Sequence, residues 1–254
     1  MRFIAIIPAR YASTRFPGKP LADIGGQTMI ERVYRRVNAV FENLCVATDD
    51  ERIEQVVKAF GGTVAMTSEA HRSGTDRVGE ALDTIERTTG ERFDVAVNVQ
   101  GDEPFVAEEH LVKIRALFDD PAIEIATLVK PFADGEDIFN PNSPKVVLDG
   151  YGNALMFSRS AIPHLRGVPP EEWSSKHTYL KHIGLYAYRA DTLRAITQLP
   201  QGELERAESL EQLRWLENGY RIRTALTASE TVAVDTPEDL QRVLAMLDEK
   251  IKKA

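Results

Sequence analysis

The sequence predicts an α/β fold with a mostly parallel sheet, helices on both faces and an inserted β-hairpin region. Through the first half of the chain, short apolar runs alternate with amphipathic patterns of helical period, which is typical of a parallel sheet covered by helices. After Val129 this alternation stops, and Pro131, Pro141 and Pro144 precede two β-type runs. A chain of 254 residues is long enough for such a fold with a buried core.

The predicted strands of the first half are short runs rich in Val, Ile and Ala, and turn residues bound them. They cover residues 2–8, 44–48, 63–66, 93–100 and 123–129. Between them, capping residues mark where helices begin. Thr28 and Glu31 form a capping box, and Asp49 or Asp50 caps the next helix, which ends at Gly61–Gly62.

The second half is less regular, and its centre is a hairpin turned at Gly150-Tyr151-Gly152. We expect one domain, residues 1–254, in which residues 131–190 form an inserted region. The other predicted elements are hairpin strands at 145–149 and 153–158, a strand at 181–188, a helix at 203–218, a last strand at 231–234, and a helix that Thr236 and Pro237 begin.

Composition limits the partners of this chain. Its formal net charge is −8 at pH 7, whereas nucleic-acid binding needs a basic face, so we expect a small ligand. The N-terminus runs directly into the first predicted strand, unlike a signal peptide, and no apolar run approaches the roughly 20 residues of a membrane span. We therefore expect a cytoplasmic protein that binds neither nucleic acid nor membranes. Cys45, inside an apolar run, is expected to be a buried, inert thiol.

The N-terminal segment that includes the loop after the first strand is cationic, although the whole chain is acidic. Residues 1–22 carry Arg2, Arg10, Arg15 and Lys19 and no carboxylate. Ligands of open α/β sheets bind beyond the carboxyl ends of the strands, and arginine and lysine suit a polyphosphate there. A solvated cationic loop is the alternative. Neither GxxxxGK[ST] nor GxGxxG follows the first strand, so a P-loop and a dinucleotide site lack their fingerprints.

Two acidic residues follow predicted strands that lie far apart in the sequence. Asp102 comes after residues 93–100, and Asp235 comes after residues 231–234. Two such carboxylates can converge on one Mg²⁺, which prefers oxygen ligands. The local alternatives are a turn residue beside Gly101 and an acid that favours the dipole of the last helix.

Seven segments spread over nearly the whole chain carry a resemblance to a known family. They are IIPARYASTRFPGKPL, SGTDR, NVQGDEP, FSRSAIP, KHIGLYAYR, ESLEQLRWLENGYRI and VDTPEDL. In combination they resemble the sugar-acid cytidylyltransferases. The resemblance implies a Rossmann-like nucleotidyltransferase sheet and Mg²⁺-dependent transfer of CMP from CTP to a sugar acid, with 3-deoxy-manno-octulosonate (KDO) the expected acceptor, for lipopolysaccharide biosynthesis. It also implies a homodimer built with the inserted region.

The resemblance further implies roles for individual residues, several of which would be unremarkable on local grounds alone. Arg159 and Glu211 would otherwise be surface residues, and His182 would be a structural histidine. The implied catalytic residues are Lys19, Arg10 and Asp102; the nucleotide-binding residues are Arg10, Arg15, Lys19, Arg77 and Gln100; the sugar-binding residues are Gln100, Arg159, His182 and Glu211; and the metal ligands are Asp102 and Asp235.

Three alternatives to KDO transfer remain open at this stage. The acceptor could be another sugar acid, such as 8-amino-KDO or a sialic acid. A nucleotide sensor without catalysis is a second alternative, although it would not need Lys19 together with two carboxylates. An NAD-dependent dehydrogenase would require the absent glycine fingerprint.

Overall fold

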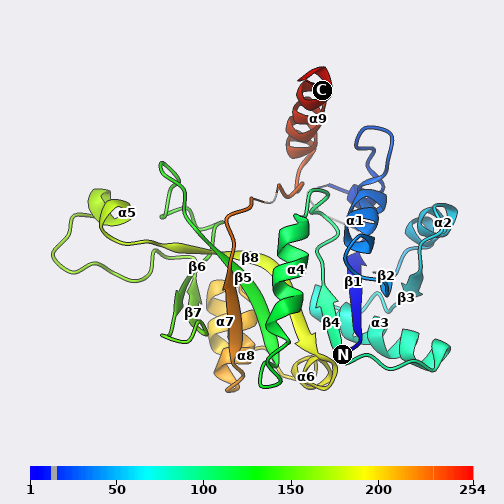
Figure 1. Ribbon diagram of the computed structural model, residues 1–254, viewed down its shortest axis with the longest axis horizontal. Coiled ribbons are helices and arrows are strands. Elements are labelled where there is room, and N and C mark those ends of the chain that lie inside the picture. The colour runs from blue at the N-terminus through cyan, green and yellow to red at the C-terminus, as the bar shows by residue number, and fades with distance from the viewer. Residues whose placement is uncertain (13–15, 231, 254) are drawn as a thin grey trace. The chain divides into compact units, whose positions relative to one another are not determined.

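The computed structural model describes residues 1–12, 16–230 and 232–253 (Figure 1). The chain gathers into two compact units, Met1–Leu111 with Glu230–Ala254, and Val112–Ser229. Both units combine strands with helices, so the predicted α/β class is confirmed. None of the described helices is both long enough and apolar enough to cross a bilayer.

The first unit is built on a parallel sheet. Its strands are β1 (Phe3–Ala9), β2 (Leu44–Thr48), β3 (Val64–Met66) and β4 (Val95–Asn98), in the order β3-β2-β1-β4. Every residue of β2 and β4 is buried, as expected for parallel strands with both faces covered. The predicted strands are therefore confirmed, although the last of them, predicted over residues 93–100, is shorter: β4 leaves out residues 93 and 94 at its start and residues 99 and 100 at its end.

The helices of this unit start where capping chemistry predicts. The helices α1 (Met29–Asn38), α2 (Glu51–Ala59) and α3 (Gly74–Thr89) are capped by Thr28, Asp50 and Ser73. Of the two candidate caps for α2, Asp50 is the one used: its carboxylate accepts from Arg52 N. The other elements are the short 3₁₀ turn η1 (Lys19–Leu21), the helix α4 (Glu108–Leu117), which spans the unit boundary, and the helix α9 (Pro237–Lys253), whose N-cap is Thr236.

The second unit contains the predicted hairpin. The strand β5 (Ile125–Pro131) pairs antiparallel with β8 (Leu180–Arg189) and parallel with β9 (Ile222–Leu226). The hairpin strands β6 (Lys145–Leu148) and β7 (Ala154–Ser158) are antiparallel, and β6 also pairs with β8. At the turn, the Asp149 carboxylate accepts from Tyr151 N and Asn153 N. The remaining elements are η2 (Pro170–Glu172), α5 (Trp173–Lys176) and α6 (Ala190–Ile196).

The single helix predicted over residues 203–218 is wrong. Two helices are present, α7 (Glu203–Glu208) and α8 (Gln212–Glu217). Ser209 separates them with a φ of 50°, in the left-handed region, which ends a helix because its amides no longer follow the helical path. The amphipathic pattern continues through the break, so periodicity alone could not reveal it.

The last predicted strand, at 231–234, is also not found where the structure describes the chain. Thr231 lies outside the described residues, and residues 232–234 form no strand. Val234 is nevertheless fully buried, in a cluster with Ile24, Met29 and Val243, and its N–H donates to Asp102 O at 2.9 Å. The apolar character that suggested a strand serves core packing instead.

Candidate active site

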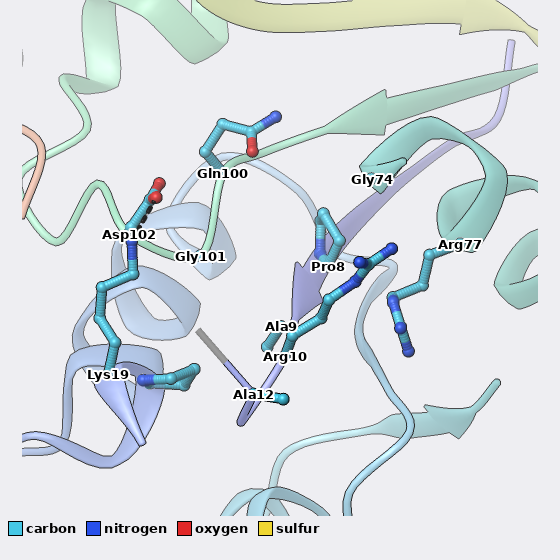
Figure 2. A pocket seen from close by; sticks show the side chains of 11 residues that line it. Pro8, Ala9, Arg10, Ala12, Lys19, Gly74, Arg77, Gln100, Gly101 and Asp102 are labelled. Carbon is cyan, nitrogen blue, oxygen red and sulfur yellow. Dashed lines mark hydrogen bonds and ion pairs between the residues drawn. The ribbon is translucent and has the colours of Figure 1, made fainter. Parts of the chain in front are cut away.

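A cavity of about 350 Å³ lies at the carboxyl ends of β1 and β4 in the first unit (Figure 2). Five predicted site residues line this cavity, and Arg15 lies outside the described residues. The lining residues are Pro8, Ala9, Arg10, Ala12, Lys19, Pro20, Gly74, Arg77, Gln100, Gly101 and Asp102. The cavity thus occupies the edge of the sheet where ligands of α/β proteins bind.

Gly101 allows the turn after β4 to approach the end of β1 closely. A Cβ atom at this position would lie 2.8 Å from Pro8 O, which is too close for a carbon and a carbonyl oxygen. Only glycine therefore fits without moving the backbone. This approach brings Asp102, which follows β4, to the same cavity as Arg10, which follows β1.

Lys19 joins two carboxylates from distant parts of the sequence. Its Nζ lies 2.7 Å from Asp102 Oδ2 and 3.1 Å from Asp235 Oδ1, although Lys19 and Asp235 are 216 positions apart. Figure 2 shows the Lys19 side chain extending to Asp102. The 3₁₀ turn that Lys19 begins is preceded by Gly18 at a φ of 73°, and the Lys19 side chain is 13% exposed. The lysine ammonium is thus a shared counter-ion of the two acids.

Arg10 and Arg77, the two arginines that line the cavity, have different surroundings. Arg10 Nη2 donates to the main-chain carbonyl of His71. Arg77 is fully buried and donates from Nη1 to Thr67 Oγ1 at 2.7 Å and from Nη2 to Asp49 Oδ2 at 2.5 Å. Arg77 is therefore first of all half of a buried ion pair, and its contact with a nucleotide stays a prediction.

The predicted sugar-binding residues, apart from Gln100, lie in the second unit. On β8, burial lowers the pKa of His182 to about 4, so its imidazole is neutral near pH 7. Its Nε2 lies 3.2 Å from Thr127 Oγ1, whose hydroxyl has the carbonyl oxygens of Ile183 and Leu185 as acceptors. The carbonyl oxygens can only accept the single hydroxyl proton, so a neutral His182 completes the contacts of Thr127 best by donating from Nε2, which leaves Nδ1 as an acceptor.

Glu211 and His182 approach the same aromatic residue. The rings of His182 and Tyr186 are 5.2 Å apart. Burial raises the pKa of Tyr186 well above its usual value, and the charge of Glu211 is among the smaller causes. Glu211 is also the residue before α8. Two of the predicted sugar residues therefore act on one tyrosine, His182 through a ring contact and Glu211 through its charge.

The guanidinium of Arg159 is held by main-chain oxygens. Nε donates to Glu208 O at 2.6 Å, Nη1 to Pro141 O at 2.8 Å, and Nη2 to Ser209 O at 3.2 Å. Within the part of the chain that the structure describes, no carboxylate forms an ion pair with this guanidinium. Its positive charge thus remains for another anion.

Comparison with known proteins identifies the family of this chain. Residues 4–222 match the family described as cytidylyltransferase. The chain belongs to the cytidylyltransferase family.

Individual relatives of this cytidylyltransferase agree over almost their whole length. Two are named 3-deoxy-manno-octulosonate cytidylyltransferase: one from Parabacteroides distasonis is 60% identical, covering 97% of this chain and 98% of its own, and one from Phocaeicola vulgatus is 58% identical, covering 98% and 99%. A solved structure of CMP:2-keto-3-deoxy-manno-octonic acid synthetase complexed with CTP has a TM-score of 0.88 and 42% identity, covering 98% of this chain and all of that one. The resemblance seen in the sequence is confirmed.

The carboxylates of the cytidylyltransferase fit a divalent cation. Two carboxylate oxygens that both reach one ammonium nitrogen can also reach one metal ion. Among the described residues, no group of three or more His, Cys, Asp or Glu side chains is gathered as a metal site. A cation held by Asp102 and Asp235 would therefore complete its shell with water and phosphate oxygens, which is the usual mode of Mg²⁺.

Sequence reasoning missed several residues of the cytidylyltransferase that border the predicted ones. The sequence pattern predicts Asp49 only as a candidate helix cap and gives Glu103 no role. Burial, and secondarily the charge of Asp102, raises the pKa of Glu103 to about 7. In the second unit, Gln212 Nε2 is buried with no hydrogen-bond partner in the described structure. The adjacent acids at 102 and 103 were a visible signal, whereas the pairing of Asp49 with Arg77 had none.

Proposed function

We propose that this cytidylyltransferase transfers CMP from CTP to the anomeric hydroxyl of KDO and releases CMP-KDO and pyrophosphate, for lipopolysaccharide biosynthesis. The observation that carries the proposal is the meeting of Lys19 with Asp102 and Asp235 beside a cavity lined by Arg10. One site then offers cations for phosphates and carboxylates for a metal. The names of the relatives support CTP and KDO as the substrates.

In this proposal the cationic residues of the first unit bind the triphosphate. Arg10, Arg15 and Lys19 contact phosphate oxygens, and Arg77 and Gln100 contact the nucleoside part. Transfer requires the anomeric oxygen to attack the α-phosphorus in line, with cleavage of the bond to the pyrophosphate oxygen and loss of the hydroxyl proton. Lys19 and Arg10 neutralise the charge that grows on the departing pyrophosphate.

Asp102 and Asp235 would hold Mg²⁺ when nucleotide is bound. The ion would supply positive charge to the phosphate oxygens and lower the pKa of the acceptor hydroxyl. For both carboxylates to ligate a metal, the Lys19 ammonium must leave at least one of them. A triphosphate supplies a new anionic partner for Lys19, so nucleotide binding favours this exchange.

The residues of the second unit recognise the sugar acid. Arg159 binds the carboxylate, because its guanidinium is held by neutral carbonyls and keeps its charge. Neutral His182 accepts a sugar hydroxyl at Nδ1, since Nε2 is engaged by Thr127. Glu211 accepts hydrogen bonds from further hydroxyls, and Gln100 serves both substrates. In this division, Arg159 alone recognises the carboxylate of the sugar acid.

The proposal extends to the assembly and the compartment. We expect a cytoplasmic homodimer that uses the inserted region, residues 131–190. In that region Ile138, Trp173 and Tyr179 form a buried cluster, while Phe139 is 47% exposed and its ring lies 5.6 Å from Trp173. Aromatic residues are enriched at protein–protein interfaces, and this supports the expectation. One chain has a mass of 28.4 kDa, and light scattering on the purified protein should give twice that value. A monomeric mass would contradict the proposed homodimer.

The deciding experiment measures pyrophosphate release with Mg²⁺ and matched substrate pairs. CTP with KDO is run beside UTP and ATP with KDO, and beside CTP with sialic acid and with 8-amino-KDO. Release with CTP and KDO, and little with the other pairs, is expected. Release with 8-amino-KDO instead would change the acceptor, and no release in any pair would overturn the proposal.

A further inference from the structure

Arg159 depends on a corner of the chain that the sequence pattern does not reveal. Glu208 ends α7, and Ser209 turns the chain with its left-handed backbone. The carbonyl oxygens of both residues consequently leave the helical path and accept from Arg159 Nε and Nη2. The break between α7 and α8 therefore forms the cradle of the guanidinium.

The Glu208 side chain fixes the main chain on which Arg159 sits. Its Oε1 accepts from Ser158 Oγ at 2.7 Å, and its Oε2 accepts from Arg159 N at 2.8 Å. Ser158 is the last residue of β7 and is buried. One carboxylate thus ties the end of the hairpin to the end of α7 at two points.

Lys145 binds the main-chain carbonyl of the same residue. Its Nζ donates to Arg159 O at 2.5 Å and to Asn140 O at 2.9 Å, and Lys145 is paired with Ser158 across the hairpin. The main-chain N–H and C=O of Arg159 are therefore bound to Glu208 and Lys145, while its guanidinium, among the residues that the structure describes, is bound to main-chain carbonyls alone. The charged side chains of Glu208 and Lys145 thus fix the backbone of Arg159, and neutral carbonyl oxygens fix its guanidinium.

This distribution has an electrostatic consequence. If Glu208 paired directly with the guanidinium, it would neutralise the group that must bind a substrate anion. Instead the carboxylate accepts from a main-chain amide and a hydroxyl, so the guanidinium is fixed in place without losing its charge. An arginine held in this way binds a carboxylate with little loss of side-chain entropy.

We propose that Glu208 is a positioning residue for the sugar acid: it holds Arg159 in the orientation that receives the substrate carboxylate. The inference rests on the proposed function, in which Arg159 binds that carboxylate. Glu208 itself contacts no substrate in this proposal, so its loss acts through Arg159.

The test compares Glu208→Gln with Glu217→Gln in the pyrophosphate assay. Glutamine at 208 removes the negative charge: its amide oxygen can still accept from Arg159 N, but its amide nitrogen can only donate to Ser158 Oγ, which already accepts from Ser160 N. The Ser158 hydroxyl proton then loses its carboxylate acceptor. Glu217 is a matched control: it accepts from Glu203 N and Leu204 N at the other end of α7. We expect Glu208→Gln to raise KM for KDO about tenfold or more and to leave KM for CTP unchanged, and Glu217→Gln to change neither KM.

A double-mutant cycle with Arg159→Ala separates the possible failures. If Glu208 acts through Arg159, Glu208→Gln adds nothing to KM for KDO once Arg159 is alanine. An equal, additive rise in both backgrounds would overturn the proposal, as would an unchanged KM in the single variant. If Arg159→Ala leaves KM for KDO unchanged, the assignment of Arg159 fails, and wild-type protein without turnover would mean that the proposed function fails. Circular dichroism of each variant identifies a folding defect, and Glu208→Asp, which keeps the charge, should then recover part of the affinity for KDO.

Discussion

The Nζ of Lys19 lies 2.7 Å from Oδ2 of Asp102, and the same nitrogen lies 3.1 Å from Oδ1 of Asp235. One cation therefore compensates two carboxylates that are proposed to hold a metal. The lysine ammonium and a divalent ion compete for these carboxylates, so both cannot bind the two carboxylates together at the same time. Lys19 is thus placed either to neutralise the acids or, when nucleotide and metal are present, to bind phosphate.

Lys19→Met should lower kcat by about 10²- to 10³-fold, the cost of removing one preorganised donor to a developing charge. The apolar stem of methionine keeps most of the packing of the lysine. Steady-state pyrophosphate release with saturating CTP and KDO measures the effect. A kcat within threefold of wild type would remove Lys19 from the mechanism.

The wild-type Lys19 side chain should also weaken the binding of a divalent ion to Asp102 and Asp235 when no nucleotide is bound. In Lys19→Met the two carboxylates lose their internal counter-ion, so Mn²⁺ should bind about tenfold more tightly without CTP. Asp102→Asn should shift the affinity in the opposite direction, because it removes a ligand. Electron paramagnetic resonance of free Mn²⁺ reports both variants, and equal affinities in the two would contradict a shared site.

Asp49→Asn should destabilise the protein far more than the neighbouring change Asp50→Asn. Arg77 is fully buried, and its Nη2 pairs with Asp49, so loss of that charge leaves an uncompensated guanidinium at a cost of about 3–5 kcal/mol. Asp50 caps α2, and asparagine is a comparable cap, so its replacement should cost less than about 1 kcal/mol. Urea unfolding compares the two, and similar midpoints would show that Asp49 is not the essential partner.

The contrast between these two aspartates shows what sequence can predict. Thr28 is recognisable as a cap, and Asp50 as one of two candidates beside Asp49, because a cap and its helix are neighbours in sequence. The pairing of Asp49 with Arg77 joins residues 28 positions apart, and that of Lys19 with Asp235 joins residues 216 apart. Local patterns carry no information on such partners. The resemblance to a family supplied Lys19 and both carboxylates as site residues, but not their mutual contact.

The same reasoning explains the errors in the second half. The break at Ser209 is stabilised by contacts of Glu208 with Ser158 and Arg159, about 50 positions away, while the local pattern favours one continuous helix. At residues 232–234 the apolar run packs into a core cluster rather than pairing in a sheet. Periodicity detects burial in both places, and tertiary contacts decide which structure uses it.

Gly101→Ala should reduce both stability and activity. The added Cβ would lie 2.8 Å from Pro8 O, so the end of β1, which leads to Arg10, and the turn that carries Asp102 would have to separate, at about 1–3 kcal/mol. Gly150→Ala is the control, because a Cβ at that position meets nothing within 4 Å. Thermal unfolding and kcat are measured for both. A fully active Gly101→Ala variant would mean that the close approach does not set the site.

The final prediction concerns acid stability. His182 has its pKa lowered to about 4 by burial, whereas an unfolded histidine titrates near 6.5. Above pH 6.5 the side chain is neutral in both states and contributes no pH dependence. Between pH 6.5 and about 4 only the unfolded state takes up the proton, so the free energy of unfolding should decrease as the pH is lowered, by up to about 1.4 kcal/mol per pH unit.

The control is His182→Gln, because glutamine can retain the donor to Thr127 without titrating. The difference between the wild-type and His182→Gln unfolding free energies should therefore change steadily across this window and level off below it. If the two curves run parallel from pH 7 to pH 4, His182 is not a buried neutral histidine, and the acceptor role assigned to its Nδ1 falls with it.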